Sequence, residues 1–287
     1  HAHYAIPHTA AAWIAKELIG QAAPPIITTL HGTDIIYLGA MAEYRPLLQH
    51  VLEASNLVTC VSRNLKERTE QLFNLDTEIE VVPNFFEPKP VTRSREDIRA
   101  SLDVGDGVLA IHASNLRSIK RIDLMLDAFK EAVSRCDANL LIMAGAEASR
   151  IQPEIKKRDL ESHVRIVDDV YEIDNYYAAS DFTLYTSEYE SFCLGILEGM
   201  RHGLPSIAFE VGGIPEVVVN EDSGILVPFG DIEALGVAIV RLVEDRDCRK
   251  EMGASARARA EKEFSAGAIV DSYLGAYRRV LARESPM

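Results

Sequence analysis

The sequence has no long apolar run and no excess of positive charge. Its longest apolar runs, such as GVLAIHA and NLLIMAGA, have the length of strands and fall far short of the ~18 residues that a membrane-spanning helix needs. Lys and Arg number 30 against 44 Asp and Glu, so the formal net charge is −14. A chain this acidic does not attract nucleic acid or anionic lipid as a whole. We therefore expect neither a nucleic-acid partner nor an integral membrane segment.

Cysteine is scarce as well. The four cysteines contain no C-x-x-C pair, so the sequence offers neither a disulfide framework nor a cysteine-based metal centre. This usage favours reduced thiols and a cytoplasmic location. Hydrophobic residues make up 47% and charged residues 26% of the 287 positions, which is typical of a folded chain with about two domains.

The chain also lacks a signal-like segment at its start. Its opening stretch, HAHYAIPHTAAAWIAKELIG, reads as the end of a strand followed at once by a helix. Because an α/β domain seldom begins in the middle of such a unit, we expect the chain to be a fragment or a shortened form of a longer protein.

Short apolar runs alternate with amphipathic stretches along the chain. PPIITTLHG and LVTCVS have strand character, and YRPLLQHVLEAS between them has helical spacing. This alternation predicts parallel, doubly wound sheets, in which ligands bind beyond the carboxyl ends of the strands. The residues that close the first strands are therefore of interest, namely His31, Ser62 and Asn84.

A change of pattern between Pro83 and Asp106, with three prolines and a charge cluster, indicates a domain boundary. We expect a shortened N-terminal Rossmann-like domain over residues 1–100 and a complete one over residues 101–264. The tail, residues 265–287, has apolar residues at helical spacing and is expected to pack near the first domain. The predicted fold class is α/β, with two Rossmann-like domains of which the first is truncated.

Two cations follow the first strand of the second domain. Arg117 and Lys120, in HASNLRSIKR, lie where a strand is expected to lead into a helix. The free N–H groups and positive dipole at a helix start attract anions and disfavour cations, so two cations at this place suit a bound diphosphate. The alternative is that both are solvated surface charges.

Two glutamates stand eight residues apart in SEYESFCLGILE. The preceding strand is expected to end near Ser187 and a helix to begin around Phe192 to Leu194, which places Glu190 in a loop and Glu198 inside the helix. Carboxylates accept hydrogen bonds from vicinal hydroxyls, so each glutamate suits a sugar or a ribose, and the backbone N–H groups between them suit an anion. The alternative is that both are exposed residues of a helix start.

The next segment, RHGLPSIAFEVGGIPEVV, supplies a helix-capping glycine at Gly203 and a glycine pair at Gly212 and Gly213. The pair lies at the carboxyl end of an expected strand. Because glycine has no Cβ, the pair is expected to let the backbone approach a ligand closely.

Taken together, SNLRSIKR, ESFCLGILEGMRHGLPSIAFEVGGIPEVV and SGILVPFGD resemble the C-terminal domain of the retaining GT-B glycosyltransferases of family 4, and HAHYAIPHTAAAWIAKELIG and IITTLHGTDIIYLG are similar to N-terminal motifs within that family. The resemblance covers essentially the whole chain. It implies a GT-B fold, with two domains facing a cleft, and transfer of a hexose such as N-acetylglucosamine from a UDP-linked or other nucleotide sugar to an acceptor hydroxyl.

The resemblance further implies retention at the anomeric carbon, no cofactor and no metal ion, because Arg and Lys stabilise the leaving group. The implied partners are a nucleotide sugar and a small-molecule or glycan acceptor, and assembly into a homo-oligomer stays open.

The resemblance also assigns roles to residues. It implies that Arg117 and Lys120 hold the donor diphosphate, that Glu198 binds the ribose, and that Glu190 binds hydroxyls of the donor sugar. His31 in LHGTD corresponds to a histidine that reaches the donor sugar. The implied catalytic residues are thus His31, Arg117, Lys120 and Glu190. Further donor-binding positions are Asn115, Val170, Ser191, Phe192, Cys193 and Leu194, and the acceptor-side positions are His3, Tyr4 and Thr29.

Three features depart from the family pattern. The first βα units are absent, and with them the glycine-rich loop that closes over donor and acceptor. Cys193 stands where relatives usually carry Gly, and because a Cβ tolerates positive φ poorly, we expect the loop at the sugar to be shifted. Gln49 stands where malate-using members carry an arginine, which weakens malate as the acceptor.

Other interpretations stay open at this point. Without the first βα units, the chain can be a protein that binds nucleotide sugars but does not transfer them, or one that is active only with a partner chain. His1, His3 and His8 lie near one another but have no acidic or cysteine partner at zinc-like spacing. Cys193 has no histidine close in sequence to activate it as a nucleophile, and no lysine stands out as the Schiff-base site of a phosphorylase.

Overall fold

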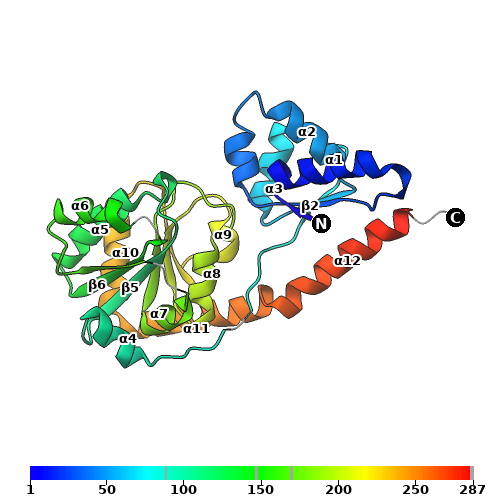
Figure 1. The fold of residues 1–287 in the computed structure, drawn as a ribbon. Coiled ribbons are helices and arrows are strands. Elements are labelled where there is room, and N and C mark those ends of the chain that lie inside the picture. The colour runs from blue at the N-terminus through cyan, green and yellow to red at the C-terminus, as the bar shows by residue number, and fades with distance from the viewer. Residues whose placement is uncertain (88, 146–147, 169–170, 285–287) are drawn as a thin grey trace. The chain divides into compact units, whose positions relative to one another are not determined.

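The computed structural model describes residues 1–87, 89–145, 148–168 and 171–284, and the chain divides into two compact units. Unit 1 comprises His1–Phe85 together with the C-terminal segment from Ala266, and unit 2 comprises Phe86–Ser265. Each unit contains a parallel sheet with helices (Figure 1). The predicted α/β class is confirmed.

Unit 1 contains a four-stranded parallel sheet in the order β1-β2-β3-β4. Its strands are β1 (Ala2–His3), β2 (Ile27–Leu30), β3 (Leu57–Cys60) and β4 (Ile79–Val81). The helices that connect them are α1 (Ala10–Ile19), α2 (Arg45–Glu53) and α3 (Arg63–Leu72). All residues of β2 and β3 are buried, as expected for central strands of a parallel sheet that is covered on both faces.

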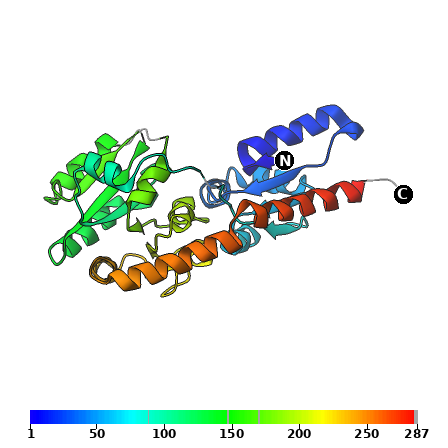
Figure 2. The ribbon, with the colours of Figure 1, turned by 90° about the horizontal axis from the view of Figure 1, so that it is seen from below.

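The C-terminal helix α12 (Ala266–Glu284) packs on the sheet of unit 1 (Figure 2). Ala276 and Val280 form a buried cluster with Ile27 of β2 and Leu57 of β3. Next to this cluster Arg279 forms an ion pair with Glu80 of β4. A helix from the far end of the sequence thus completes the core of the N-terminal unit.

Unit 2 contains a six-stranded parallel sheet in the order β10-β9-β8-β5-β6-β7. Its strands are β5 (Val108–Ala113), β6 (Ala138–Met143), β7 (Val164–Val167), β8 (Phe182–Tyr185), β9 (Ser206–Phe209) and β10 (Gly224–Val227). Its helices are α4 (Arg95–Leu102), α5 (Ile122–Val133), α6 (Ala148–Lys156), α7 (Ile173–Ala179), α8 (Leu194–Arg201), α9 (Ile214–Val217), α10 (Ile232–Glu244) and α11 (Arg246–Glu263).

Helices cover both faces of this sheet. Leu140 and Ile142 of β6 pack in one buried cluster with α5, α6 and α10. Their neighbours Leu141 and Met143 pack in the other cluster, with α4 and α7. Alternate side chains of one strand therefore enter two cores, which is why the strand is apolar throughout.

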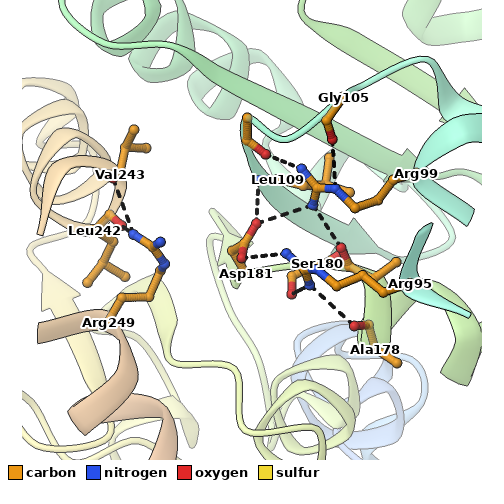
Figure 3. Close-up of polar contacts among 12 residues, drawn as sticks. Arg95, Arg99, Gly105, Leu109, Ala178, Ser180, Asp181, Leu242, Val243 and Arg249 are labelled. Atoms are coloured by element: carbon orange, nitrogen blue, oxygen red, sulfur yellow. Dashed lines mark hydrogen bonds and ion pairs between the residues drawn. The ribbon is translucent and has the colours of Figure 1, made fainter. Parts of the chain in front are cut away.

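A partly buried ionic network fastens α4 to the amino ends of the strands (Figure 3). Asp181, just before β8, accepts hydrogen bonds from Arg95 at 2.7 Å and from the backbone N–H of Leu109 at 2.8 Å. Arg99 contributes a second ion pair to Asp181 at 3.4 Å. This network lies at the opposite end of the strands from the residues that the sequence assigns to the ligand, so its role is structural.

Two element predictions need correction. The strand DFTLYTS ends at Tyr185, two residues before the predicted end at Ser187. In addition, the segment Arg246–Glu263, to which the sequence analysis gave no element, forms the 18-residue helix α11.

Candidate active site

Loops at the carboxyl ends of β5 and β8, which are neighbours in the sheet, carry the predicted donor-binding residues. Lys120 Nζ lies 2.6 Å from Glu190 Oε1, and both side chains are largely buried, at 19% and 11% exposure. The hydroxyl of Ser187 donates a hydrogen bond to the same Oε1 at 2.7 Å. The structure thus brings together a cation and a carboxylate that are 70 residues apart in sequence.

Backbone contacts join these two loops. The N–H of Glu188 donates to the carbonyl of Ile119 at 2.8 Å, and the hydroxyl of Thr186 donates to the carbonyl of Lys120 at 3.0 Å. These hydrogen bonds fasten the two loops to each other. The Lys120–Glu190 pair rests on this scaffold.

Arg117 and Lys120 lie before helix α5, so neither cation is in its first turn. Ser118–Lys120 form a short 3₁₀ turn, and α5 begins only at Ile122. Between them Arg121 adopts a left-handed conformation with φ 47°, which separates the turn from the helix. Arg117 and Asn115 are exposed.

Glu198 lies inside α8, as predicted. Its Oε2 accepts a hydrogen bond from the hydroxyl of Tyr177 at 3.1 Å. Burial raises the pKa of the Glu198 carboxyl, while the Tyr177 hydrogen bond and the charge of Lys89 act in the opposite direction.

The start of α8 is held by packing and by an unusual backbone conformation. The ring of Phe192 is buried and meets Phe264 edge to face at 5.5 Å, whereas Leu194 is half exposed and Ser191 partly buried. Cys193 has φ 76° and ψ 79°. Cys193 therefore adopts the left-handed region despite its Cβ, and the expected shift of the loop at the sugar stays a prediction. Burial raises the pKa of its thiol well above the usual range, so Cys193 does not have the thiolate character of a nucleophile.

The glycine pair approaches the backbone of Glu190. A Cβ on Gly212 would lie 2.0 Å from the carbonyl oxygen of Glu190, and Gly212 has φ 54°. The N–H of Gly213 donates to the same carbonyl at 2.8 Å. The pair was expected to leave room for a ligand; in the structure it leaves room for the loop that carries Glu190.

In unit 1, His3, Tyr4 and His31 form a cluster after β1 and β2. His31 Nε2 lies 2.9 Å from His3 Nδ1, and the rings of His31 and Tyr4 are 4.9 Å apart. Burial, and secondarily the charge of His3, lowers the pKa of His31 to about 4. His31 is therefore neutral near pH 7.

Thr29 has a different environment. It is fully buried, and its hydroxyl lies 2.6 Å from both His1 Nε2 and Thr59 Oγ1. It has no surface open to an acceptor in this structure. Tyr277 of α12 completes the network through a 2.7 Å contact with His1.

Asp34 was missed by the sequence analysis. Its buried carboxylate accepts hydrogen bonds from the backbone N–H groups of Ala5 at 3.0 Å and Gly32 at 3.1 Å. It thereby ties the segment after β1 to the segment that holds His31. The available signal was its place in LHGTD, directly after a strand end.

The remaining predictions concern the environment of Gln49, the position of Val170, a metal site and a membrane-spanning helix. The exposed Gln49 amide donates hydrogen bonds to Glu53 and, at 2.9 Å, to the carbonyl of Asn74. Val170 lies outside the described residues.

All four cysteines are free thiols, and His, Cys, Asp and Glu form no group of three or more that could hold a metal within the described ranges. Among the described helices, none is both long and apolar enough to span a bilayer.

Comparison with known families adds to this geometry. The model for glycosyl transferases group 1 matches residues 94–259, and the model for Glycosyltransferase Family 4 matches residues 1–89. The N-acetyl-alpha-D-glucosaminyl L-malate synthase of Bacillus anthracis is 35% identical over 284 residues, which cover 98% of this chain and 74% of that protein. The chain belongs to the group 1 glycosyltransferases.

Other relatives agree with this placement. A D-inositol 3-phosphate glycosyltransferase of Saccharomonospora viridis is 30% identical over 312 residues, covering 98% of this glycosyltransferase and 70% of the relative. The resemblance to family 4 is confirmed, including the similarity of the N-terminal motifs to an N-acetylglucosaminyl-malate synthase.

Solved structures agree on the fold. Anabaena Alr3699/HepE, in complex with UDP-glucose, superposes with a TM-score of 0.82 at 21% identity and covers 94% of this chain and 76% of its own. Sucrose-phosphate synthase from Thermosynechococcus elongatus superposes with a TM-score of 0.82 at 23% identity, and the match covers 98% of this chain and 73% of the synthase chain. The predicted GT-B fold is confirmed.

Proposed function

We propose that this glycosyltransferase moves a hexosyl group, with N-acetylglucosamine the favoured sugar, from a UDP-linked donor to an acceptor hydroxyl, with retention at the anomeric carbon and without a metal ion. The observation that carries the proposal is the 2.6 Å contact between Lys120 and Glu190. It unites a cation suited to a diphosphate with a carboxylate suited to sugar hydroxyls. UDP-glucose in Alr3699/HepE and the N-acetyl-alpha-D-glucosaminyl product in the name of the B. anthracis relative support the choice of donor.

The donor is assigned to unit 2. Arg117 and Lys120 contact the diphosphate, Glu198 accepts hydrogen bonds from the ribose, and Glu190 accepts them from the hexose. Ser187 and Lys120 both contact Oε1 of Glu190, so Oε2 is the oxygen assigned to the sugar. Asn115, Ser191 and the N–H groups of Phe192, Cys193 and Leu194 complete the proposed contacts.

In the proposed reaction the bond from the anomeric carbon to the diphosphate breaks while the bond to the acceptor oxygen forms on the same face. The departing diphosphate accepts the acceptor's proton. Arg117 and Lys120 stabilise the negative charge that develops on the diphosphate, so an enzyme nucleophile is not required.

The acceptor is assigned to the exposed residues His3 and Tyr4 of the cluster in unit 1. His31, neutral near pH 7, is assigned to the donor sugar, where it introduces no charge. Gln49 provides no charge for a dicarboxylate, which argues against malate and favours another small-molecule or glycan hydroxyl.

The test is titration of the protein with UDP-glucose, UDP-N-acetylglucosamine, UDP-galactose, GDP-mannose and ADP-glucose, with turnover measured in parallel. The proposal predicts binding of a UDP-sugar, transfer or slow hydrolysis, and an α-configured product. Binding without either reaction favours a protein that only holds nucleotide sugars. Absence of binding to every donor contradicts the proposal.

Arg117→Met and Lys120→Met are each expected to lower kcat by about 10²–10³-fold, because each removes one charge from the developing leaving group. Lys130→Met is a matched control, since Lys130 lies on α5 with 51% of its side chain exposed. Lys120→Met also leaves Glu190 without its cation, which can destabilise the fold. The thermal melting temperature of this variant therefore shows whether its lower kcat comes from the lost charge or from unfolding. Unchanged kcat in Arg117→Met would contradict the assigned role.

A further inference from the structure

Two fully buried tyrosines lie behind Glu198. Tyr177 donates its hydroxyl proton to Glu198 Oε2 at 3.1 Å, and its oxygen lies 3.2 Å from the hydroxyl of Tyr185. The single proton of Tyr177 is used toward Glu198, so Tyr185 is the donor in the bond between the two hydroxyls; the carbonyl of Ala113, 3.4 Å away, is the second acceptor near the Tyr185 hydroxyl. The chain runs from Tyr185 through Tyr177 to the carboxylate.

The sequence makes room for this chain at one position in α8. A Cβ on Gly195 would lie 2.0 Å from the Tyr185 oxygen and 2.7 Å from the ring carbon that bears it. Glycine inside a helix costs about 1 kcal/mol relative to alanine. Its presence in the first turn of α8 is explained by the Tyr185 hydroxyl.

Tyr177 is itself held in place. Its ring stacks on His202, with centroids 6.0 Å apart and planes at 8°. His202 Nε2 lies 2.9 Å from Asp174 Oδ1, and Asp174 also forms an ion pair with Arg201. The Tyr177 hydroxyl therefore has little freedom to leave Glu198.

We infer that Tyr177 is a positioning residue for the ribose of the donor: it occupies Oε2 of Glu198 and thereby directs Oε1 toward the two ribose hydroxyls, with Tyr185 as its support. This inference rests on the proposed function, because it takes Glu198 as the ribose ligand. Tyr177 is buried and does not contact the nucleotide.

The same contact influences the ionisation of Glu198. Burial raises the pKa of Glu198, and the hydrogen bond from Tyr177 and the charge of Lys89 lower it. Tyr185 and the Cys193 thiol are the other titratable groups coupled to Glu198, and burial raises the pKa of each well above its usual range. Both stay protonated near pH 7, so loss of the Tyr177 hydroxyl raises the pKa of Glu198 further.

The experiment measures UDP binding by calorimetry from pH 5 to 8, for the wild-type protein, Tyr177→Phe and the control Tyr176→Phe. Tyr177→Phe is expected to weaken UDP binding about tenfold or more at pH 7, as for loss of one hydrogen bond to a charged group. As the pH decreases, the affinity of Tyr177→Phe for UDP is also expected to start falling at a higher pH than that of the wild type. Binding of 2′,3′-dideoxy-UDP, which lacks both ribose hydroxyls, is expected to be the same in all three proteins.

Gly195→Ala is an independent variant that removes no hydroxyl group. Its Cβ forces the Tyr185 hydroxyl away. Gly195→Ala is therefore expected to weaken UDP binding, to show the same rise in the pH at which affinity falls, and to bind the dideoxy analogue like the wild type. With an active donor, both variants are expected to raise KM and leave kcat nearly unchanged, because the ribose contact is made equally in the ground and transition states.

The outcomes separate the two proposals. Wild-type protein that binds none of UDP, GDP and ADP overturns the proposed function, and this inference with it. Wild-type protein that binds UDP while Tyr177→Phe shows the same affinity and pH profile overturns only the positioning role. Equal weakening of UDP and its dideoxy analogue assigns Tyr177 to general packing, which also overturns it.

Discussion

Cys193 is a non-glycine residue held in the left-handed region where α8 begins. Its φ of 76° places its Cβ in a conformation that costs about 1–2 kcal/mol for an L-residue, and its side chain is buried. The N–H groups of the residues around it are assigned to the donor. The strain therefore lies beside backbone N–H groups that the proposed function assigns to the donor, and ligand sites are a common place for such strain.

Cys193→Gly is expected to unfold at a urea concentration equal to or above that of the wild type, because glycine adopts this φ without strain. Cys193→Val is expected to lose about 2 kcal/mol, because a β-branched residue at positive φ is a severe outlier. Equilibrium urea denaturation followed by circular dichroism measures both. A valine variant as stable as the wild type would show that the loop adapts at no cost.

At the scale of single residues, the sequence singled out Lys120 and Glu190 but did not predict the contact between them. Glu190 and Lys120 were both singled out because each follows a strand, and parallel strands end at one edge of a sheet. Their direct contact follows from the neighbouring places of β5 and β8, a long-range pairing that local patterns do not contain. The burial of Thr29 was missed for the same reason, since it depends on Thr59 in the neighbouring strand β3.

At the scale of the elements, the connection between β9 and α9 packs directly against the loop that carries Glu190. Gly212 meets the carbonyl of Glu190, and Gly213 donates a hydrogen bond to it. The position of the Glu190 carboxylate therefore depends on a loop that does not itself carry a donor-binding side chain.

Gly212→Ala is expected to weaken donor binding at least tenfold and to destabilise unit 2 by about 2–3 kcal/mol, because it combines an unfavourable φ with a clash against backbone. Gly105→Ala is the matched control: Gly105 has φ 53°, nearly the φ of Gly212, but a Cβ there meets nothing within 4 Å. The control is expected to lose about 1 kcal/mol and no affinity. Equal effects of the two variants on affinity would contradict the coupling of the loops.

The strands and amphipathic helices were predictable because their apolar residues recur with the period of the element. Helix α11 was not, because it has no broad apolar stripe. It buries small residues, including Ala256 and Ala260, and Gly253 lies so close to the carbonyl of Gly203 that a Cβ would be 2.2 Å from it. Its richness in Ala, Arg, Glu and Lys, all good helix formers, was the usable signal.

At the scale of the whole molecule, buried histidines link stability to pH. Burial lowers the pKa of His31 in unit 1, and of His112 and His202 in unit 2, to about 4. The unfolded chain therefore binds more protons than the folded one between pH 6.5 and about 4. The contribution of these histidines to the free energy of unfolding is fully present above pH 6.5 and is lost as the pH decreases through this range.

His112 is expected to account for about 2 kcal/mol of this loss by pH 5, since it is fully buried and donates to the carbonyl of Leu184. In His112→Asn the urea midpoint of unit 2 is expected to fall less steeply between pH 7 and 5 than in the wild type. The single tryptophan, Trp13, lies in unit 1, so fluorescence follows that unit while circular dichroism follows both. Parallel pH curves for the two proteins would contradict this account.

The proposed function places a nucleotide diphosphate at the carboxyl ends of β5 and β8. The decisive measurement is a crystal structure of the protein with UDP. We expect diphosphate oxygens within about 3 Å of the Arg117 guanidinium and Lys120 Nζ, and both ribose hydroxyls on the carboxylate of Glu198. A nucleotide bound at another place, or a diphosphate that neither cation contacts, would contradict this placement.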